Sequence, residues 1–130
     1  MLKTGGGSIV NIAPISGLRA SALRVACGTS KAAIIQLTRQ QAVELRNVGI
    51  RVNAIAPGPV DTEMSKLAHS VAIRSDYCDT IPLNRYGTTK EIALVLGFLC
   101  SPAASCANGQ VLAMNGVWGD RRGFLPTLRR

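Results

Sequence analysis

Residues 51–62 read Arg51-Val52-Asn53-Ala54-Ile55-Ala56-Pro57-Gly58-Pro59-Val60-Asp61-Thr62. The run from Ile50 to Ala56 is short and largely apolar, which predicts a buried strand of a parallel sheet. The Pro57-Gly58-Pro59 turn ends this strand, because proline cannot donate a ladder hydrogen bond. Thr62 has a side chain that caps helices, and the sequence therefore predicts a short helix beginning at Glu63.

Two other short apolar runs predict further strands of the same sheet. Ser8 to Ala13 follows a glycine cluster and stops at Pro14, which predicts a fully buried strand. Gly109 to Ala113 predicts a third strand, and the Asn115-Gly116 pair turns the chain out of it.

A long helix is predicted between the first two strands. It runs from about Cys27 or Thr29 to Asn47, after a loop over residues 15–26, and Gly49 supplies its stop. The apolar residues expected on one face are Ile34, Leu37 and Leu45, with Ile35 and Ala42 beside them.

The region between the second and third strands predicts one further regular helix. Thr88 or Thr89 with Glu91 forms a capping pattern, and apolar residues continue through Leu99. The segment from Glu63 to Tyr77 is less regular. Strands separated by helices of this length predict parallel pairing under crossover helices.

The whole pattern predicts one α/β domain over residues 1–130. We expect a partial Rossmann-type, three-layer fold with about three parallel strands and crossover helices, followed by a basic tail at residues 116–130. The 130 residues are 47% hydrophobic, enough for one real core. The chain shows neither a membrane-length apolar run nor a signal peptide, and a cytoplasmic location is therefore expected.

Cysteine spacing and charge exclude several other classes of function. The four cysteines form no C-x-x-C pair and His69 has no metal-type partner, so we expect reduced thiols and no metal site. The net charge of +8 is dispersed except in the tail, at Arg121, Arg122, Arg129 and Arg130. This distribution favours at most weak, salt-sensitive contact with polyanions, and no sequence-specific nucleic-acid binding.

Three segments, taken in order, carry a family resemblance: residues 7–13 (Gly-Ser-Ile-Val-Asn-Ile-Ala), 29–33 (Thr-Ser-Lys-Ala-Ala) and 51–62. They resemble the later half of a short-chain dehydrogenase/reductase, and the resemblance covers Met1 to Gly116. It implies a Rossmann-type oxidoreductase that uses NAD or NADP and acts on a carbonyl or hydroxyl group. The family's glycine-rich turn would lie upstream of Met1, and the chain is expected to begin inside the fold.

The resemblance implies an incomplete reaction centre. Lys31 matches the family lysine that contacts the nicotinamide ribose and lowers the pKa of a catalytic tyrosine. Cys27 stands at the tyrosine position, four residues earlier, and Pro14 stands at the position of the family's substrate-orienting serine. Ser16, two residues further on, is an alternative hydroxyl that requires a shifted loop.

Two other segments receive expected roles from the resemblance. Pro57, Gly58, Val60 and Thr62 match the segment that binds the nicotinamide end of the coenzyme. Residues 63–79 match a mobile substrate lid, whose apolar residues either line a pocket or form a buried helix stripe; these are Met64, Leu67 and Val71.

Structural roles are expected for two strand asparagines, Asn11 and Asn53. The Gly5-Gly6-Gly7 cluster precedes a strand, so it predicts a loop and not a phosphate cradle.

Four functions follow from these observations. The first is an NAD(P)-dependent oxidoreductase by descent, truncated and catalytically impaired on its own. The second is a non-catalytic interaction module that forms homo-oligomers or binds a full-length relative, because an unpaired strand edge and the helix face of Ile34 and Leu37 are expected to be exposed. The third is a basic polyanion binder. The fourth is a thiol activity at Cys27, since a helix N-terminus and a nearby lysine lower a thiol pKa.

Overall fold

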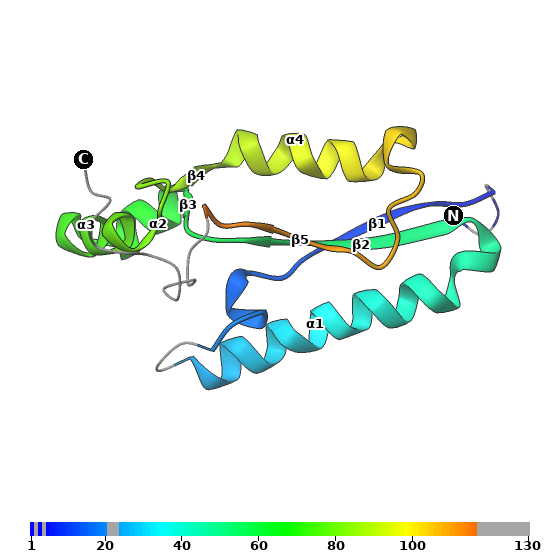
Figure 1. Cartoon of the computed structure of the whole chain (residues 1–130), viewed down its shortest axis with the longest axis horizontal. Helices are drawn as coiled ribbons and strands as arrows, with labels where there is room; N and C mark the ends of the chain where they lie inside the picture. Colours follow the sequence, from blue (N-terminus) through cyan, green and yellow to red (C-terminus); the bar gives the residue numbers. More distant parts are fainter. Residues whose placement is uncertain (2, 4, 21–23, 117–130) are drawn as a thin grey trace.

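The computed structural model describes residues 1, 3, 5–20 and 24–116. Its main sheet has three parallel strands in the order β1-β2-β5, namely β1 (Gly7–Ile12), β2 (Ile50–Pro57) and β5 (Val111–Met114). Helix α1 (Val25–Glu44) covers one face of the sheet and helix α4 (Thr89–Cys100) covers the other (Figure 1). The predicted three-layer α/β arrangement with parallel strands is therefore confirmed.

A second, smaller sheet joins the remaining elements to this core. Strands β3 (Val60–Asp61) and β4 (Gly87–Thr88) pair in parallel, and between them the chain forms helices α2 (Glu63–Ala68) and α3 (Val71–Thr80). Three short 3₁₀-helices complete the described elements, at Ile15–Gly17, Arg46–Val48 and Pro102–Ala104.

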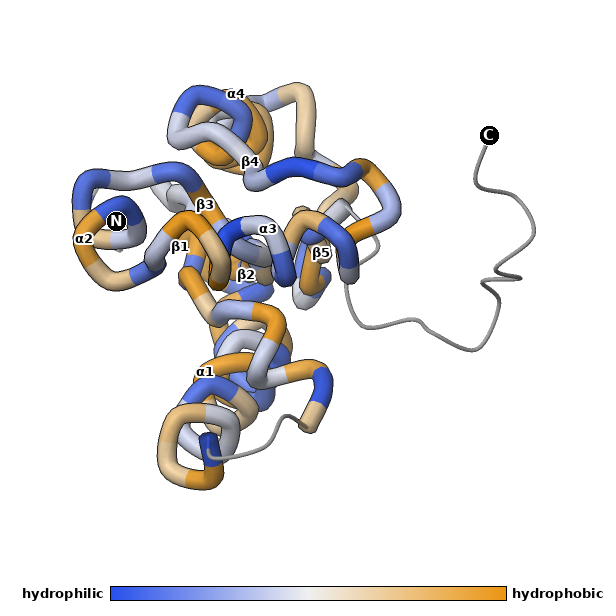
Figure 2. Tube along the Cα trace, turned by 90° about the vertical axis from the view of Figure 1, so that its left-hand side faces the viewer, coloured by the Kyte–Doolittle hydropathy of each residue, from blue (hydrophilic) through white to orange (hydrophobic). Residues whose placement is uncertain are grey.

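The core is centred on β2, the middle strand of the main sheet. Every residue of β2 except Arg51 is buried, as the apolar run predicts. On one side Ala42 of α1 packs with Ile50 and Val52, and on the other Leu99 of α4 packs with Ile55. The hydropathy colouring of Figure 2 shows this stack end-on, with α4 above and α1 below the strands.

Asparagine side chains tie the strands to their surroundings. Asn53 is fully buried, and its amide donates to the Ala107 carbonyl (2.8 Å) while its Oδ1 accepts from the Gln110 N–H (3.0 Å). Asn11 donates to the Thr38 hydroxyl of α1 (3.0 Å). Both asparagines have the structural contacts expected of them, since buried polar groups need hydrogen-bond partners.

Helix capping agrees with the sequence pattern. Thr62 caps α2 through a capping box with Ser65, and Thr88 caps α4 through a capping box with Glu91. Each box satisfies backbone N–H groups that the first helical turn leaves without partners.

Several sequence expectations are wrong in detail. Strand β1 is half-buried because, among the described strands, only β2 lies beside it. Helix α1 begins at Val25 and ends at Glu44, and its core face is formed by Ile35, Thr38 and Ala42, while Leu37 is 49% exposed. The third strand begins two residues later than predicted.

The segment after the second strand also departs from expectation. Residues 71–80 form the regular helix α3, where the sequence lacked a periodic apolar pattern. Neither α2 nor α3 buries a residue, and Met64, Leu67 and Val71 are 79%, 90% and 87% exposed. They form no buried stripe. The predicted tail lies almost entirely outside the described residues, which end at Gly116.

Candidate functional site

The candidate site lies where the parallel strands end. The register pairs Ile12 with Ile55 and Pro57 with Met114, so the loops after all three strands leave the same edge of the sheet. Ligands of open α/β sheets bind at this carboxyl edge. Gly58 brings two loops together, because a Cβ there would lie 2.9 Å from the Asn115 Cα.

The loop after β1 packs closely against helix α1. Pro14 leads into the 3₁₀-helix Ile15–Gly17, in which Ile15 is buried. Gly17 lies directly on the helix backbone, since a Cβ there would approach the Lys31 carbonyl carbon at 2.7 Å and the Ala32 nitrogen at 2.9 Å. This contact fixes the loop relative to Lys31.

A Gly17→Ala substitution should therefore be destabilising. Its new methyl group would meet backbone atoms that cannot move aside, and overpacking of this kind costs roughly 1–3 kcal/mol. Gly97→Ala is the matched control, because a Cβ at that helical position meets nothing within 4 Å. Urea unfolding should show a loss for the first variant and a neutral or stabilising effect for the second. Equal behaviour of the two variants would contradict this packing.

The structure brings Cys27 and Ser16 together. The Cys27 thiol is half-buried and its sulfur lies 3.7 Å from the Ser16 hydroxyl oxygen. Cys27 and Lys31 lie four positions apart within α1 and share a helix face. This part of the chain thus pairs a hydroxyl with a thiol; that the two stand in for the family's serine and tyrosine remains an expectation from the resemblance. Enhanced reactivity of Cys27 remains a prediction.

The Pro57–Thr62 segment crosses from the main sheet to the small one. Pro57 ends β2 as a buried residue, Val60 begins β3, and Thr62 precedes α2. The Thr62 hydroxyl accepts a hydrogen bond from the Ser65 N–H (3.1 Å), and the Ser65 hydroxyl accepts one from the Thr62 N–H (2.9 Å). Thr62 therefore has a capping role in addition to the coenzyme contact expected from the resemblance.

A polar and aromatic cluster, which the sequence pattern did not reveal, holds α2 and α3. Arg74 of α3 forms an ion pair with Asp61 of β3 (2.9 Å) and its guanidinium lies 4.4 Å from the centre of the Tyr86 ring. His69 Nδ1 is 2.9 Å from the Tyr86 hydroxyl, and its ring stacks on Tyr77 at 5.2 Å. Burial raises the pKa of the Tyr86 phenol. Neither helix buries a residue, so these contacts and the β3–β4 pairing hold α2 and α3 in position. These two helices span the segment expected to be the lid.

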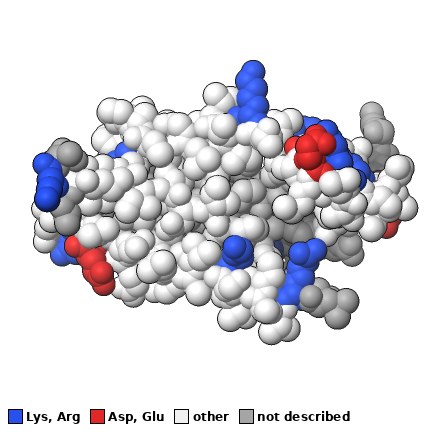
Figure 3. Space-filling model, turned by 180° about the vertical axis from the view of Figure 1, so that it is seen from behind, with Lys and Arg blue, Asp and Glu red and all other residues white. Residues whose placement is uncertain are grey.

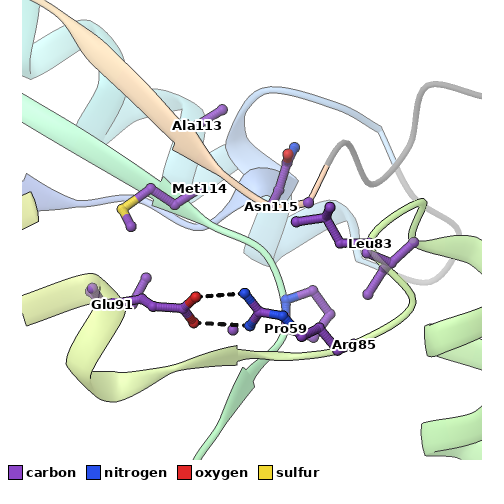
Figure 4. Close-up of a pocket in the computed structure, with 11 residues that line it drawn as sticks. Pro59, Leu83, Arg85, Glu91, Ala113, Met114 and Asn115 are labelled. Atoms are coloured by element: carbon purple, nitrogen blue, oxygen red, sulfur yellow. Dashed lines mark hydrogen bonds and ion pairs between the residues drawn. The ribbon is translucent and has the colours of Figure 1, made fainter.

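A cavity of about 300 Å³ lies beside this edge, between the ends of β5, the small sheet and the start of α4 (Figure 4). Its wall is mostly apolar, with Leu83, Ile92 and Met114 among the lining residues. The charged part of the wall is an ion pair, in which the Arg85 guanidinium contacts Glu91 at 2.6 and 3.0 Å.

The Glu91 carboxylate has a pH-dependent role. The Arg85 guanidinium, helped by the Thr88 N–H and hydroxyl, lowers the pKa of Glu91 from 4.5 to about 2. Because the pKa of Glu91 is lower in the folded state than in the unfolded chain, the ionised carboxylate gives its full stabilisation above about pH 4.5. This stabilisation is lost as the pH falls toward 2. The melting-temperature difference between the native chain and Glu91→Gln should shrink over that window. A difference that is constant with pH would contradict this role.

The charges of the described residues are scattered. Figure 3 shows a face that is mostly uncharged, with separated basic side chains and no continuous basic patch. Among the described residues no group of His, Cys, Asp and Glu can hold a metal ion. The four cysteines are all free. Within the described part of the chain, no helix is long and apolar enough to cross a membrane.

Comparison with known proteins defines the class of this fold. A family model described as enoyl-(acyl carrier protein) reductase matches residues 1–116. The chain belongs to this family of short-chain dehydrogenases/reductases. Among curated relatives, the 3-oxoacyl-(acyl-carrier-protein) reductase FabG of Aquifex aeolicus (strain VF5) is 40% identical over 116 residues, which cover 89% of this chain and 46% of the relative.

Solved structures agree with this assignment. A 7α-hydroxysteroid dehydrogenase complexed with NADH and 7-oxo glycochenodeoxycholic acid is 36% identical with a TM-score of 0.86, covering 91% of this chain and 46% of that one. A 4-hydroxyisoleucine dehydrogenase complexed with NADH is 36% identical with a TM-score of 0.82, covering 87% and 47%. The chain spans about half the length of the relatives it matches. The partial Rossmann-type fold expected from the sequence is confirmed.

Proposed function

We propose that these 130 residues derive from an NAD(P)-dependent oxidoreductase acting on a carbonyl or hydroxyl substrate, and that on their own they have little or no turnover. The observation that carries this proposal is the pair of side chains on α1. The residue four positions before Lys31 is Cys27, whose thiol contacts Ser16. A thiol side chain is several ångströms shorter than a phenol, so it does not reach a carbonyl placed for tyrosine.

The described residues fit only one end of a dinucleotide. Lys31 and the Pro57–Thr62 segment lie at or near the carboxyl edge and suit the nicotinamide end, where bound NAD(P)H supplies a hydride. A diphosphate needs a glycine-rich turn between a strand and a helix N-terminus. The cluster Gly5-Gly6-Gly7 lies at the amino ends of the strands, opposite the carboxyl edge. There Gly7 begins β1 and Gly6 packs against Gly49. Within the described residues, no glycine cluster lies where the diphosphate would bind.

Titration calorimetry with NADH and NADPH tests the coenzyme part of this proposal. We expect no binding tighter than millimolar. Without contacts to the diphosphate, the chain loses much of its affinity for the coenzyme and does not position the nicotinamide. A relative such as the Aquifex reductase serves as the positive control. Micromolar binding of either coenzyme by the 130-residue chain would contradict the proposal.

The second candidate is a non-catalytic interaction module. It is favoured by the half-buried edge strand β1 and by Leu37, which is 49% exposed on α1. Co-purification of the chain with a full-length relative supports this candidate, and its absence argues against it. The proposed family activity carries three further expectations. They are a carbonyl or alcohol substrate, NAD or NADP as the coenzyme, and a cytoplasmic location.

A further inference from the structure

An aromatic and charged cluster lies between α2, α3 and the start of β4. It contains the single histidine of the chain and both of its tyrosines, namely His69, Tyr77 and Tyr86. The three ring centres lie 5.2, 6.0 and 6.1 Å from one another. Arg74 of α3 places its guanidinium 4.4 Å from the centre of the Tyr86 ring. Every member of the cluster lies within residues 61–86, all of which the structure describes.

One of these contacts joins α2 to α3. His69 directly follows α2, and Ser70 caps α3. The imidazole of His69 stacks on the Tyr77 ring, with an angle of 20° between the two planes. Aromatic contacts of this kind stabilise beyond the area that they bury. The stack spans the junction at Ser70, so we expect the two helices to move as one unit, residues 63–80.

Several contacts between this unit and the rest of the molecule converge on two residues, Tyr86 and Asp61. The Tyr86 hydroxyl lies 2.9 Å from the His69 Nδ1, and its ring is perpendicular to that of Tyr77. The same ring faces Arg74, whose guanidinium also donates to the Asp61 carboxylate at 2.9 Å. Figure 1 shows both helices at the same end of the molecule as β3 and β4.

The Arg74 guanidinium indicates that the Tyr86 ring is part of this attachment. Its Nη1 is buried and has no hydrogen-bond partner among the described residues. A buried charged group without compensation is costly, and an aromatic face attracts a guanidinium electrostatically. The Tyr86 ring therefore compensates the nitrogen that Asp61 leaves unpaired.

The two anchoring residues are fixed outside the helices. Asp61 belongs to β3, which pairs with β4, and Tyr86 directly precedes β4 and is only 6% exposed. The residue that follows α3, Ile81, is 3% exposed. Both ends of residues 63–80 are therefore held by elements that do not have to move when the helices do.

We propose that Tyr86 is a latch for α2 and α3: the two helices open together as one unit by leaving its ring, while β3 and β4 stay in place. Opening breaks the contacts of His69, Tyr77 and Arg74 with Tyr86 in one step, together with the Arg74–Asp61 ion pair. It keeps the His69–Tyr77 stack. Native proteins open locally in cooperative units of this kind. The latch belongs to the fold and does not depend on whether the chain turns over a substrate.

The chain contains its own reporter of this opening, Cys78 of α3. Arg74, Tyr77 and Cys78 are half-buried, and their spacing puts them on one helix face, the face that meets Tyr86. Burial is the main cause of the raised pKa of Tyr86, and Cys78 adds to it, which places the thiol near the phenol. Alkylation of Cys78 therefore requires this face to open, whereas Cys100 is exposed and gives the rate of an open thiol.

Iodoacetamide alkylation of Cys78, measured by peptide mass spectrometry in the native chain and three variants, tests the latch. Tyr86→Phe keeps the ring and removes the hydrogen bond to His69. The Cys78 rate should then rise roughly 2–12-fold, the equivalent of one hydrogen bond. Arg74→Gln removes the cation–π contact and the ion pair with Asp61, and the rate should rise at least about threefold.

Lys66→Gln is the matched control for the loss of a cation. Its ion pair with Glu63 (2.8 Å) lies within α2 and does not reach the latch, so the Cys78 rate should stay within about twofold of the native rate. The rate at Cys27, which is half-buried on α1, should be the same in all four proteins. An unchanged Cys27 rate separates local opening from global unfolding.

Amide hydrogen exchange shows whether the two helices open together. In Tyr86→Phe the amides of α2 and α3 should exchange faster by the same factor, while those of β2 should not change. Circular dichroism and melting confirm that each variant folds. If Arg74→Gln does not fold, Tyr86→Phe decides alone, because it preserves the buried ring.

Four results would overturn the proposal. They are a native Cys78 that reacts as fast as Cys100, a Tyr86→Phe variant whose Cys78 rate is unchanged, a Lys66→Gln variant whose Cys78 rate rises as much as that of Tyr86→Phe, and faster exchange in α3 without faster exchange in α2.

Discussion

Turnover should rise roughly 10²–10⁴-fold when Cys27→Tyr and Pro14→Ser are introduced into a chimera of this chain. That range is the usual contribution of a positioned general acid or base. The chimera places the 130 residues after the amino-terminal half of the Aquifex reductase, whose matched region covers 46% of its length. The resemblance implies that this half binds the coenzyme, and the proposal then expects the acid/base group to be the limiting deficiency. The measurement is NADPH oxidation with a ketone substrate.

A second variant isolates the phenol. Cys27→Phe with Pro14→Ser supplies the same ring without the hydroxyl and should be as slow as the chimera that retains Cys27. All variants should bind NADPH equally, and equal binding would show that each variant folds and takes up the coenzyme. A Cys27 chimera as active as the Tyr variant would show that the thiol at this position performs the proton transfer after all.

Asn53→Ala should be the most destabilising single substitution of a polar side chain in the sheet. The side chain is fully buried and links β2 to two backbone groups, the Ala107 carbonyl and the Gln110 N–H. Without it the Gln110 N–H loses this partner and the Ala107 carbonyl keeps only the longer bond from the Arg51 guanidinium (3.3 Å), and each lost hydrogen bond costs roughly 0.5–1.5 kcal/mol. The measured quantity is the free energy of unfolding in urea.

Asn47→Ala is the control for this substitution, because Asn47 is exposed in the 3₁₀-helix that follows α1. Its effect should stay within about 0.5 kcal/mol, as for most surface substitutions. Similar losses for the two alanine variants would mean that the Asn53 hydrogen bonds do not support the sheet.

Local signals in the sequence account for most of the elements. The apolar run at Ile50 to Ala56 and the threonine caps at Thr62 and Thr88 appear in the structure where they were predicted, because caps and strand runs depend on neighbouring residues. The role of Gly49 was also readable, since its φ of 70° is a conformation that glycine adopts without strain.

Features that depend on distant partners were not readable from the sequence. Strand β1 has the composition of a buried strand, yet its burial depends on neighbouring strands, and in the part of the chain that the structure describes it has only β2. The face of α1 that packs on the sheet includes Thr38, a polar residue whose hydroxyl accepts from Asn11, so an apolar pattern misses it. The contacts of His69 and Arg74 with Tyr86 join residues 17 and 12 positions apart through a hydrogen bond and a cation–π contact, which no periodic pattern encodes.

The site was readable only by resemblance. The positions of Cys27 and Lys31 on one helix follow from their spacing, and the loop contact between Ser16 and Cys27 does not. The register that brings the Pro14 and Pro57 loops to one edge follows from parallel pairing.

The central proposal is that the described residues of this chain do not provide the groups that deliver a hydride and a proton together. Its most direct test is multiple-turnover reduction of a ketone by the purified 130-residue chain with NADPH, next to a mock purification that carries the same host reductases. The account predicts a rate no higher than that of the mock sample. Stoichiometric product formation that follows the concentration of this chain, and that the mock sample lacks, would contradict it.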